Sequence, residues 1–136
     1  MGSWKDTYDS IVNYLESKLT SILEEYTEDT TDKVIVSKAA PKAYPSVYIW
    51  PGRIRERPAT PTRTEVSYTF TIHAVSDKDE TLEIIDKVRD VIVSDRTLGG
   101  TVDNCEVDHI LPDAHPPRAI ARYESEITIV ARKVIV

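Results

Sequence analysis

The segment from residue 64 to residue 76, TEVSYTFTIHAVS, limits the possible folds most strongly, because it alternates apolar and polar side chains along its whole length. The apolar set comprises Val66, Tyr68, Phe70, Ile72 and Ala74. Successive side chains of a strand point to opposite faces of a sheet, so this period of two predicts a strand with one buried and one polar face. A sheet built around it is expected to be covered by helices on one face only, which is an α+β layer.

Two other segments carry the period of an amphipathic helix. In residues 4–26 the apolar stripe consists of Trp4, Tyr8, Ile11, Val12, Leu15, Leu19, Ile22, Leu23 and Tyr26. In residues 77–100 the stripe consists of Leu82, Ile85, Val88, Val91 and Ile92, and Gly99-Gly100 ends the element. The long first stripe cannot be buried by the helix alone, so we expect that helix to lie across the sheet or against another subunit.

Four further segments predict strands, at about 33–37, 46–50, 101–111 and 119–136. The segment 101–111 is predicted to place Cys105, Val107, His109 and Leu111 on one side. The chain of 136 residues is therefore expected to form a single α+β domain, 1–136, with a mostly antiparallel sheet of about five strands and two helices on one face. The expected order is α-β-β-β-α-β-β. The last strand is apolar up to Val136, so we expect it to be internal in the sheet or paired with another chain.

Composition excludes several classes of function. Seventeen basic and twenty-three acidic side chains give a net charge of −6, which argues against a broad surface that grips nucleic-acid phosphates. The single cysteine, Cys105, excludes an intramolecular disulfide and any zinc site that needs two thiolates. No apolar run is long enough for a membrane span, and the N-terminus does not resemble a signal peptide. The sequence therefore predicts a soluble protein made in a cytoplasm, without membrane partners.

A metal site is the first catalytic alternative. Cys105, His109, Asp113 and His115 are of the residue types that bind zinc. Their spacing matches no standard zinc site, and a buried cysteine with histidines in a strand and a turn is the simpler interpretation.

A small hydrolase is the second catalytic alternative, using Asp103, Asp108 and His109, or the carboxylate pair of Glu124 and Glu126. The chain contains no nucleophile elbow, phosphate-binding loop, dinucleotide fingerprint or zinc-protease motif. We therefore predict a protein that is not an enzyme, with no catalytic residues, cofactor or bound metal.

The segment 52–63, GRIRERPATPTR, is predicted to form a projecting arm between two strands, either as a long loop or as a hairpin continued outward with arginines on one face. It contains Arg53, Arg55, Arg57 and Arg63 against a single acid, Glu56, so its local charge is +3. An acidic stretch follows the first helix, and its carboxylates are Glu24, Glu25, Glu28, Asp29 and Asp32. Opposite charges at two places on one subunit suit a head-to-tail contact that closes into a ring. These nine residues are the candidate contacts between subunits or with a tube.

The order of elements resembles the tail terminator (tail-completion) proteins of long-tailed bacterial and archaeal viruses. The resemblance rests on the long first helix, the YPSVYIWP segment, the arm, the alternating TEVSYTFTIHAVS strand and a helix that ends in DRTLGGTV before a final strand pair. It implies a subunit of a homo-oligomer, typically a hexameric ring, located in the virion at the neck end of the tail. Such a ring caps the tail tube, ends tube polymerisation and presents a surface to the head–tail connector protein, while DNA only passes through its lumen.

Three alternatives remain open at the level of sequence. The first is a neck or head-completion protein of the same region of the virion. The second is the small metal-dependent hydrolase, and the third is a binding module that docks a peptide along an exposed sheet edge.

Overall fold

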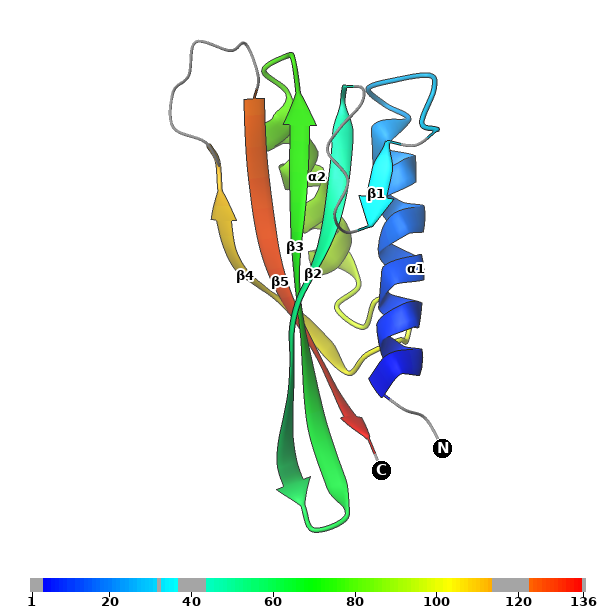
Figure 1. Ribbon diagram of the computed structural model, residues 1–136, viewed down its shortest axis with the longest axis vertical. Coiled ribbons are helices and arrows are strands. Elements are labelled where there is room, and N and C mark those ends of the chain that lie inside the picture. The colour runs from blue at the N-terminus through cyan, green and yellow to red at the C-terminus, as the bar shows by residue number, and fades with distance from the viewer. Residues whose placement is uncertain (1–3, 32, 37–43, 114–122, 136) are drawn as a thin grey trace.

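The structure is a computed structural model that describes residues 4–31, 33–36, 44–113 and 123–135. Its elements are α1 (Trp4–Leu23), β1 (Val34–Val36), β2 (Ser46–Thr60), β3 (Arg63–Ser76), α2 (Thr81–Ser94), β4 (Asn104–Leu111) and β5 (Tyr123–Ile135). The five strands form one sheet in the order β1-β2-β3-β5-β4, in which only the β1–β2 pair is parallel. Both helices lie on one face of the sheet (Figure 1). The predicted α+β class, element order and mostly antiparallel sheet are confirmed, and β5 is internal, as expected.

Strand β3 is the central strand, and it sorts its side chains as its alternation predicts. Val66, Tyr68, Phe70, Ile72 and Ala74 are at most 1 % exposed and face the helices. In the part of the chain that the structure describes, the opposite face of the sheet carries no helix (Figure 1), and we call it the open face.

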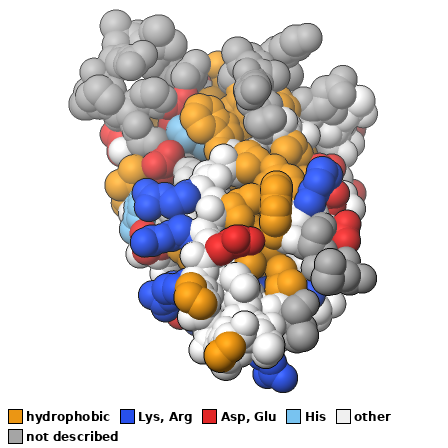
Figure 2. Space-filling view, turned by 60° about the horizontal axis from the view of Figure 1, so that its bottom comes forward, with side chains coloured by type: hydrophobic (Ala, Val, Ile, Leu, Met, Phe, Trp, Pro, Cys, Tyr) orange, Lys and Arg blue, Asp and Glu red, His pale blue; other side chains and the backbone are white. Residues whose placement is uncertain are grey.

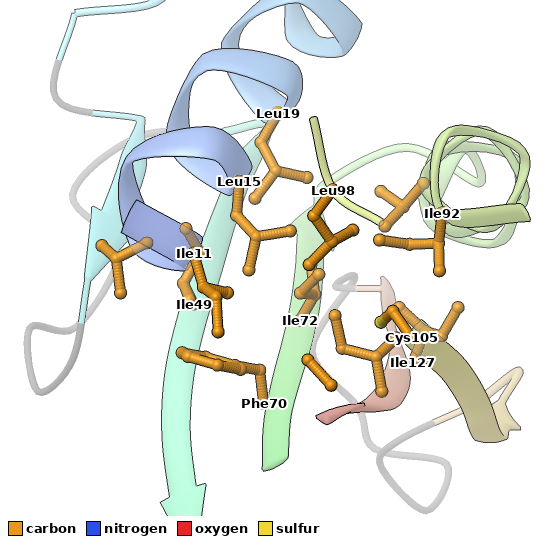
Figure 3. Close-up of a cluster of buried hydrophobic side chains, with 14 of the residues drawn as sticks. Ile11, Leu15, Leu19, Ile49, Phe70, Ile72, Ile92, Leu98, Cys105 and Ile127 are labelled. Atoms are coloured by element: carbon orange, nitrogen blue, oxygen red, sulfur yellow. The ribbon is translucent and has the colours of Figure 1, made fainter. Parts of the chain in front are cut away.

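The core lies between this sheet and the two helices. Figure 3 shows Ile11, Leu15 and Leu19 of α1 pointing from the helix towards the sheet, and Ile92 and Leu98 filling the space on the side of α2. Each of these five side chains is at most 1 % exposed. Burying a large apolar side chain contributes about 1.5–3 kcal/mol, so the apolar stripe of α1 is a major source of stability for a domain of this size.

The turn after α2 accounts for the glycines of the segment DRTLGGTV. Leu98, Gly99 and Gly100 all have positive φ, at 51°, 71° and 82°, which favours glycine at the last two positions. The Asp95 carboxylate accepts hydrogen bonds from the backbone N–H groups of Thr97 and Gly99 at 3.1 and 3.0 Å. These bonds fold the chain back so that the Leu98 side chain is fully buried in the core.

Strand β4 contains a bulge that overturns one expectation. Its pairing with β5 shifts between Val107 and His109, so the alternation of side chains changes by one residue there. Cys105 is buried on the core side, whereas His109 and Leu111 are exposed and Ile110 packs against the core instead. The prediction that Cys105, Val107, His109 and Leu111 share one side is therefore wrong from His109 onward.

Candidate functional site

The segment 52–63 continues the β2–β3 pair as a ribbon, which extends well beyond the helices (Figure 1). Strand β5 pairs with β3 along this ribbon as far as Thr64, so only the tip beyond the Pro58–Thr64 pair is two-stranded. The strands stay paired through Arg55 with Ser67 and Arg57 with Glu65, and the last pair is Thr60 with Arg63. Of the two alternatives for this segment, the structure has the continued hairpin. All side chains from residue 55 to residue 63 are exposed. We keep the name arm for residues 52–63.

The base of the arm is fixed by a bulge and by contacts to α1. Gly52 lies where the β2–β3 register shifts, and a Cβ atom added to it would lie 3.1 Å from the backbone oxygen of Thr69, so a larger residue would require that backbone to shift by a few tenths of an ångström. The buried Tyr68 donates a hydrogen bond from its hydroxyl to the backbone oxygen of Trp4 at 3.2 Å. The ring of Tyr8 stacks on Phe70 with a centroid distance of 5.8 Å. The arm therefore starts from a rigid base.

Three of the four arginines of the arm share the open face. Arg55 pairs with Ser67, and Arg57 pairs with Glu65. Ser67 and Glu65 alternate along β3 with side chains that are buried under the helices, so they and their partner arginines belong to the open face. Arg63 is two residues before Glu65 in β3, which has no bulge there, so it belongs to the open face as well, beside the turn. Arg53 lies in the bulge, outside this alternation. Figure 2 shows Lys and Arg side chains grouped along one side of this end of the molecule, beside a band of hydrophobic side chains.

Arg132 of β5 adds to this basic surface, and sequence reasoning missed it. Ser67 pairs with Arg55 on one side and with Arg132 on the other, so the two arginines lie in one cross-strand row. Arg132 follows the buried Ala131 on the alternating strand β5, and only the strand order brings its face beside the arm. Arg132 and Arg57 each have an acidic neighbour: Nη1 of Arg132 lies 3.2 Å from Oε1 of Glu106, and Nη2 of Arg57 lies 3.7 Å from Oε1 of Glu65.

The acidic stretch lies at the opposite end of the long axis from the arm (Figure 1), so the two candidate surfaces do not meet within one subunit. Glu24, Glu25, Glu28 and Asp29 are exposed, and Asp32 lies outside the described residues. Hydrogen bonds from the backbone and side chain of Thr31 hold the pKa of Asp29 below its usual value.

Helix α2 enlarges this acidic end, which the sequence did not indicate. The Tyr26 hydroxyl donates a hydrogen bond to Oε1 of Glu83 at 2.8 Å, and Nζ of Lys87 lies 3.0 Å from Oε2 of Glu25. Partial burial, together with the bond to Glu83, raises the pKa of Tyr26 to about 12. The loop after α1 is thus tied to the first half of α2, whose Glu83 and Asp86 join the same acidic surface, which we call the acidic end.

A polar and aromatic cluster occupies the open face away from the arm. Trp50, which is 54 % exposed, stacks on His73 with ring centroids 6.4 Å apart, and Tyr48 lies edge-on to both rings. Nδ1 of His73 lies 3.1 Å from Oε2 of Glu126, and its Nε2 lies 3.7 Å from Oε2 of Glu124. The structure therefore brings the predicted carboxylate pair together around a histidine that sequence reasoning did not select.

The residues proposed for a metal site do not converge. Cys105 faces the core and is fully buried, whereas His109 lies on the open face within 3.3 Å of the Thr128 hydroxyl. Burial raises the pKa of the Cys105 thiol to about 12, so the thiolate that a metal needs is disfavoured. His115 lies outside the described residues. In the part of the chain that the structure describes, no group of three or more His, Cys, Asp or Glu side chains could hold a metal ion.

The hydrolase set does not converge either. His109 contacts its neighbour Asp108, with Nδ1 2.7 Å from Oδ2. Asp103 lies beyond the other end of β4, where it accepts a hydrogen bond from the backbone N–H of Val134 at 2.8 Å. Six residues of extended strand span about 20 Å, so Asp103 cannot work with this Asp–His pair.

Two long sheet edges are poor sites for adding a peptide strand. Beyond β1, the outer edge of β2 carries Pro51 and Pro58, which lack backbone N–H groups. The outer strand β4 is interrupted by its bulge at Asp108. Prolines and bulges of this kind block edge-to-edge pairing, so the exposed side chains of the arm are better suited to binding than its backbone.

Neither helix in the described residues has the length and apolar character needed to cross a bilayer. A search of protein-family models finds none that matches this chain, and no curated protein matches it significantly. The assignment of the arm and the acidic end as candidate interaction surfaces therefore rests on their geometry and charge alone.

Proposed function

We propose that the protein is a structural subunit of a virus tail, which assembles into a ring that caps the tail tube, ends its polymerisation and joins the tail to the head connector. The observation that carries this proposal is the arm, a β-ribbon that extends beyond the domain core with all its side chains from residue 55 to residue 63 exposed. The order of elements and the arm are also the features on which the resemblance to tail terminators rests.

The tip of the arm contributes little to the stability of its own subunit. Strand β5 pairs with β3 as far as Thr64, opposite Pro58, so the tip beyond that pair has two strands alone, and a two-stranded ribbon is marginally stable in water. A long exposed ribbon with a basic face is typical of an element that becomes buried against another protein. The arm is therefore the part of the molecule whose role requires a partner.

The charges indicate how identical subunits would be joined. The basic arm and the acidic end lie at opposite ends of one subunit, so a contact between them joins two different surfaces of two copies. Such a head-to-tail contact repeats, and it forms a ring when the rotation between neighbours closes. Complementary charge would orient the incoming subunit and accelerate its association.

The first test is the oligomeric state of the purified protein. Size-exclusion chromatography with light scattering and negative-stain microscopy should show a closed ring of several subunits. Reversing Arg53, Arg55 and Arg57 to Glu should yield monomers. A matched control reverses Lys5, Lys18 and Arg89 to Glu, which changes the net charge equally without touching the arm, and it should still form rings.

The second test uses the tail-tube protein of the same virus. Adding the ring to growing tubes should stop their extension and leave a ring at one tube end, visible by electron microscopy. A protein that stays monomeric at all concentrations and leaves tube length unchanged would rule out the proposed function.

A further inference from the structure

A hollow in the surface lies between the start of α2 and strand β4. Its volume is about 460 Å³, and it is lined by Leu82, Ile85 and Ile110 together with the carboxylates of Glu83 and Asp86. Leu82 is 47 % exposed, which is unusual for a leucine on the apolar stripe of a helix. The hollow thus combines an apolar floor with an acidic rim.

The negative charge of this site extends beyond its rim. Asp77, Asp79 and Glu80 directly precede α2, with Lys78 as the basic side chain among them. Glu83 is also hydrogen-bonded to Tyr26, which links the hollow to the acidic loop that follows α1. A segment that docks here therefore needs apolar groups for the floor and positive charges for the rim.

The tip of the arm has this composition. Residues 57–63, RPATPTR, place Pro58, Ala59 and Pro61 between Arg57 and Arg63, and all of them are exposed. The two prolines restrict the backbone before binding, so less conformational entropy is lost when the tip docks. The tip and the hollow are therefore complementary in both polarity and charge.

We propose that the hollow between α2 and β4 receives the arm tip of a second copy of this chain, with Pro58, Ala59 and Pro61 on the apolar floor and Arg57 and Arg63 beside Asp86 and Glu83. This inference rests on the proposed ring and names the contact that would join its subunits. The start of α2, which lines the hollow, lies towards the acidic end, and the arm tip lies at the opposite end of the long axis (Figure 1), so one chain cannot make the contact with itself.

Disulfide trapping tests this contact directly. Ala59→Cys on the tip and Leu82→Cys in the hollow are prepared as separate variants and mixed under mild oxidation. A disulfide forms only when the two Cα atoms come within about 4.4–6.8 Å, so a docked tip should give a covalent dimer on a non-reducing gel. The native Cys105 is fully buried and should add no background. The matched control pairs Ala59→Cys with Asn13→Cys, on the exposed side of α1, and should give little product.

A charge swap gives an independent readout. Asp86→Lys should reduce the yield of trapped dimer roughly two- to fivefold, as expected for an exposed ion pair, and Arg57→Asp should do the same. Mixing an Asp86→Lys, Leu82→Cys chain with an Arg57→Asp, Ala59→Cys chain should restore the yield. Glu16→Lys on α1 serves as the control and should leave the yield unchanged.

The outcomes separate this inference from the proposed function. If rings form but the tip and the hollow crosslink no faster than the control pair, the docking site is wrong while the ring stands. If tips crosslink to each other, or only to the tube protein, the docking site is also wrong. If no oligomer forms at any concentration, both proposals fail.

Discussion

Shortening the arm should separate the stability of the subunit from its assembly. In the shortened variant, Asn-Gly replaces residues 57–65, so the ribbon would close just beyond the Glu56–Val66 pair with a turn that suits a two-residue hairpin. The removed side chains from residue 57 to residue 63 are all exposed, whereas Thr64 and Glu65 are half-buried, and their pairing with Ile135 and Val134 of β5 is lost as well. The ion pair lost, Arg57 with Glu65, spans 3.7 Å and its Arg57 side chain is 80 % exposed, so it contributes about 0.5 kcal/mol or less. Together with the lost end of the β3–β5 ladder, this should lower the free energy of unfolding of the isolated subunit by about 1–2 kcal/mol.

Assembly should respond very differently to the same change. Association stabilises a folded subunit by mass action, so each tenfold rise in protein concentration should add up to about 1.4 kcal/mol to the wild-type free energy of unfolding. The shortened variant has lost the tip, and its unfolding should not depend on concentration. Urea titrations at two protein concentrations, followed by the fluorescence of the two tryptophans, measure both quantities.

Two results would contradict this reasoning. A loss of more than about 3 kcal/mol at the lowest concentration is the size expected of a core truncation, and it would mean that the arm belongs to the subunit core. A concentration dependence equal to that of the wild type would mean that the arm does not join subunits. A variant with Arg57→Lys and Arg63→Lys keeps both charges and should associate nearly as the wild type does.

Three further outcomes follow from the core and from the acidic end. Phe70→Ala removes a side chain that is 1 % exposed and stacks on Tyr8, so urea titration should show a loss of about 3–5 kcal/mol, whereas Phe70→Leu should lose clearly less. Burial raises the pKa of the Cys105 thiol to about 12, so a thiol reagent should label the native protein only when the protein unfolds. Labelling should therefore be faster in the less stable Phe70→Ala variant. Rapid labelling of the native wild type would contradict this. The pKa of Tyr26 is raised from 10.0 to about 12, so the folded state keeps its proton where the unfolded chain loses it, and this residue's contribution to stability should decline as the pH rises from 10 towards 12. Tyr26→Phe should lose less stability than the wild type over that interval, and equal losses would contradict the assignment.

Periodicity was sufficient to predict most of the fold. The alternation of β3 and the apolar stripes of α1 and α2 each reflect burial on one face, and burial is what a sequence pattern records most directly. The same rule failed at β4, because one extra residue at Asp108 reverses the alternation and no turn residue marks it. The arm was identified by its prolines and arginines, but its ribbon form depends on pairing with β3, which local composition does not encode.

The candidate surfaces were predictable only in part. The arginines of the arm and the carboxylates after α1 are visible as charge runs in the sequence. Arg132 joins the arm only through the order β2-β3-β5, and Glu83 joins the acidic end only through its hydrogen bond with Tyr26. His73 and Glu126 are partners across neighbouring strands. In each case the missing information is the pairing of segments that lie far apart in the chain.

Strand β3 runs without interruption from the turn of the arm to the centre of the sheet, where it pairs on both sides. A pull on the arm tip along the strand direction is therefore transmitted as shear through two hydrogen-bonded ladders at once. Ladders loaded in shear must break many hydrogen bonds together, whereas ladders that are peeled from one end break them singly. A subunit held by its arm would accordingly resist tension along the arm much better than a sideways force that peels β2 from β3.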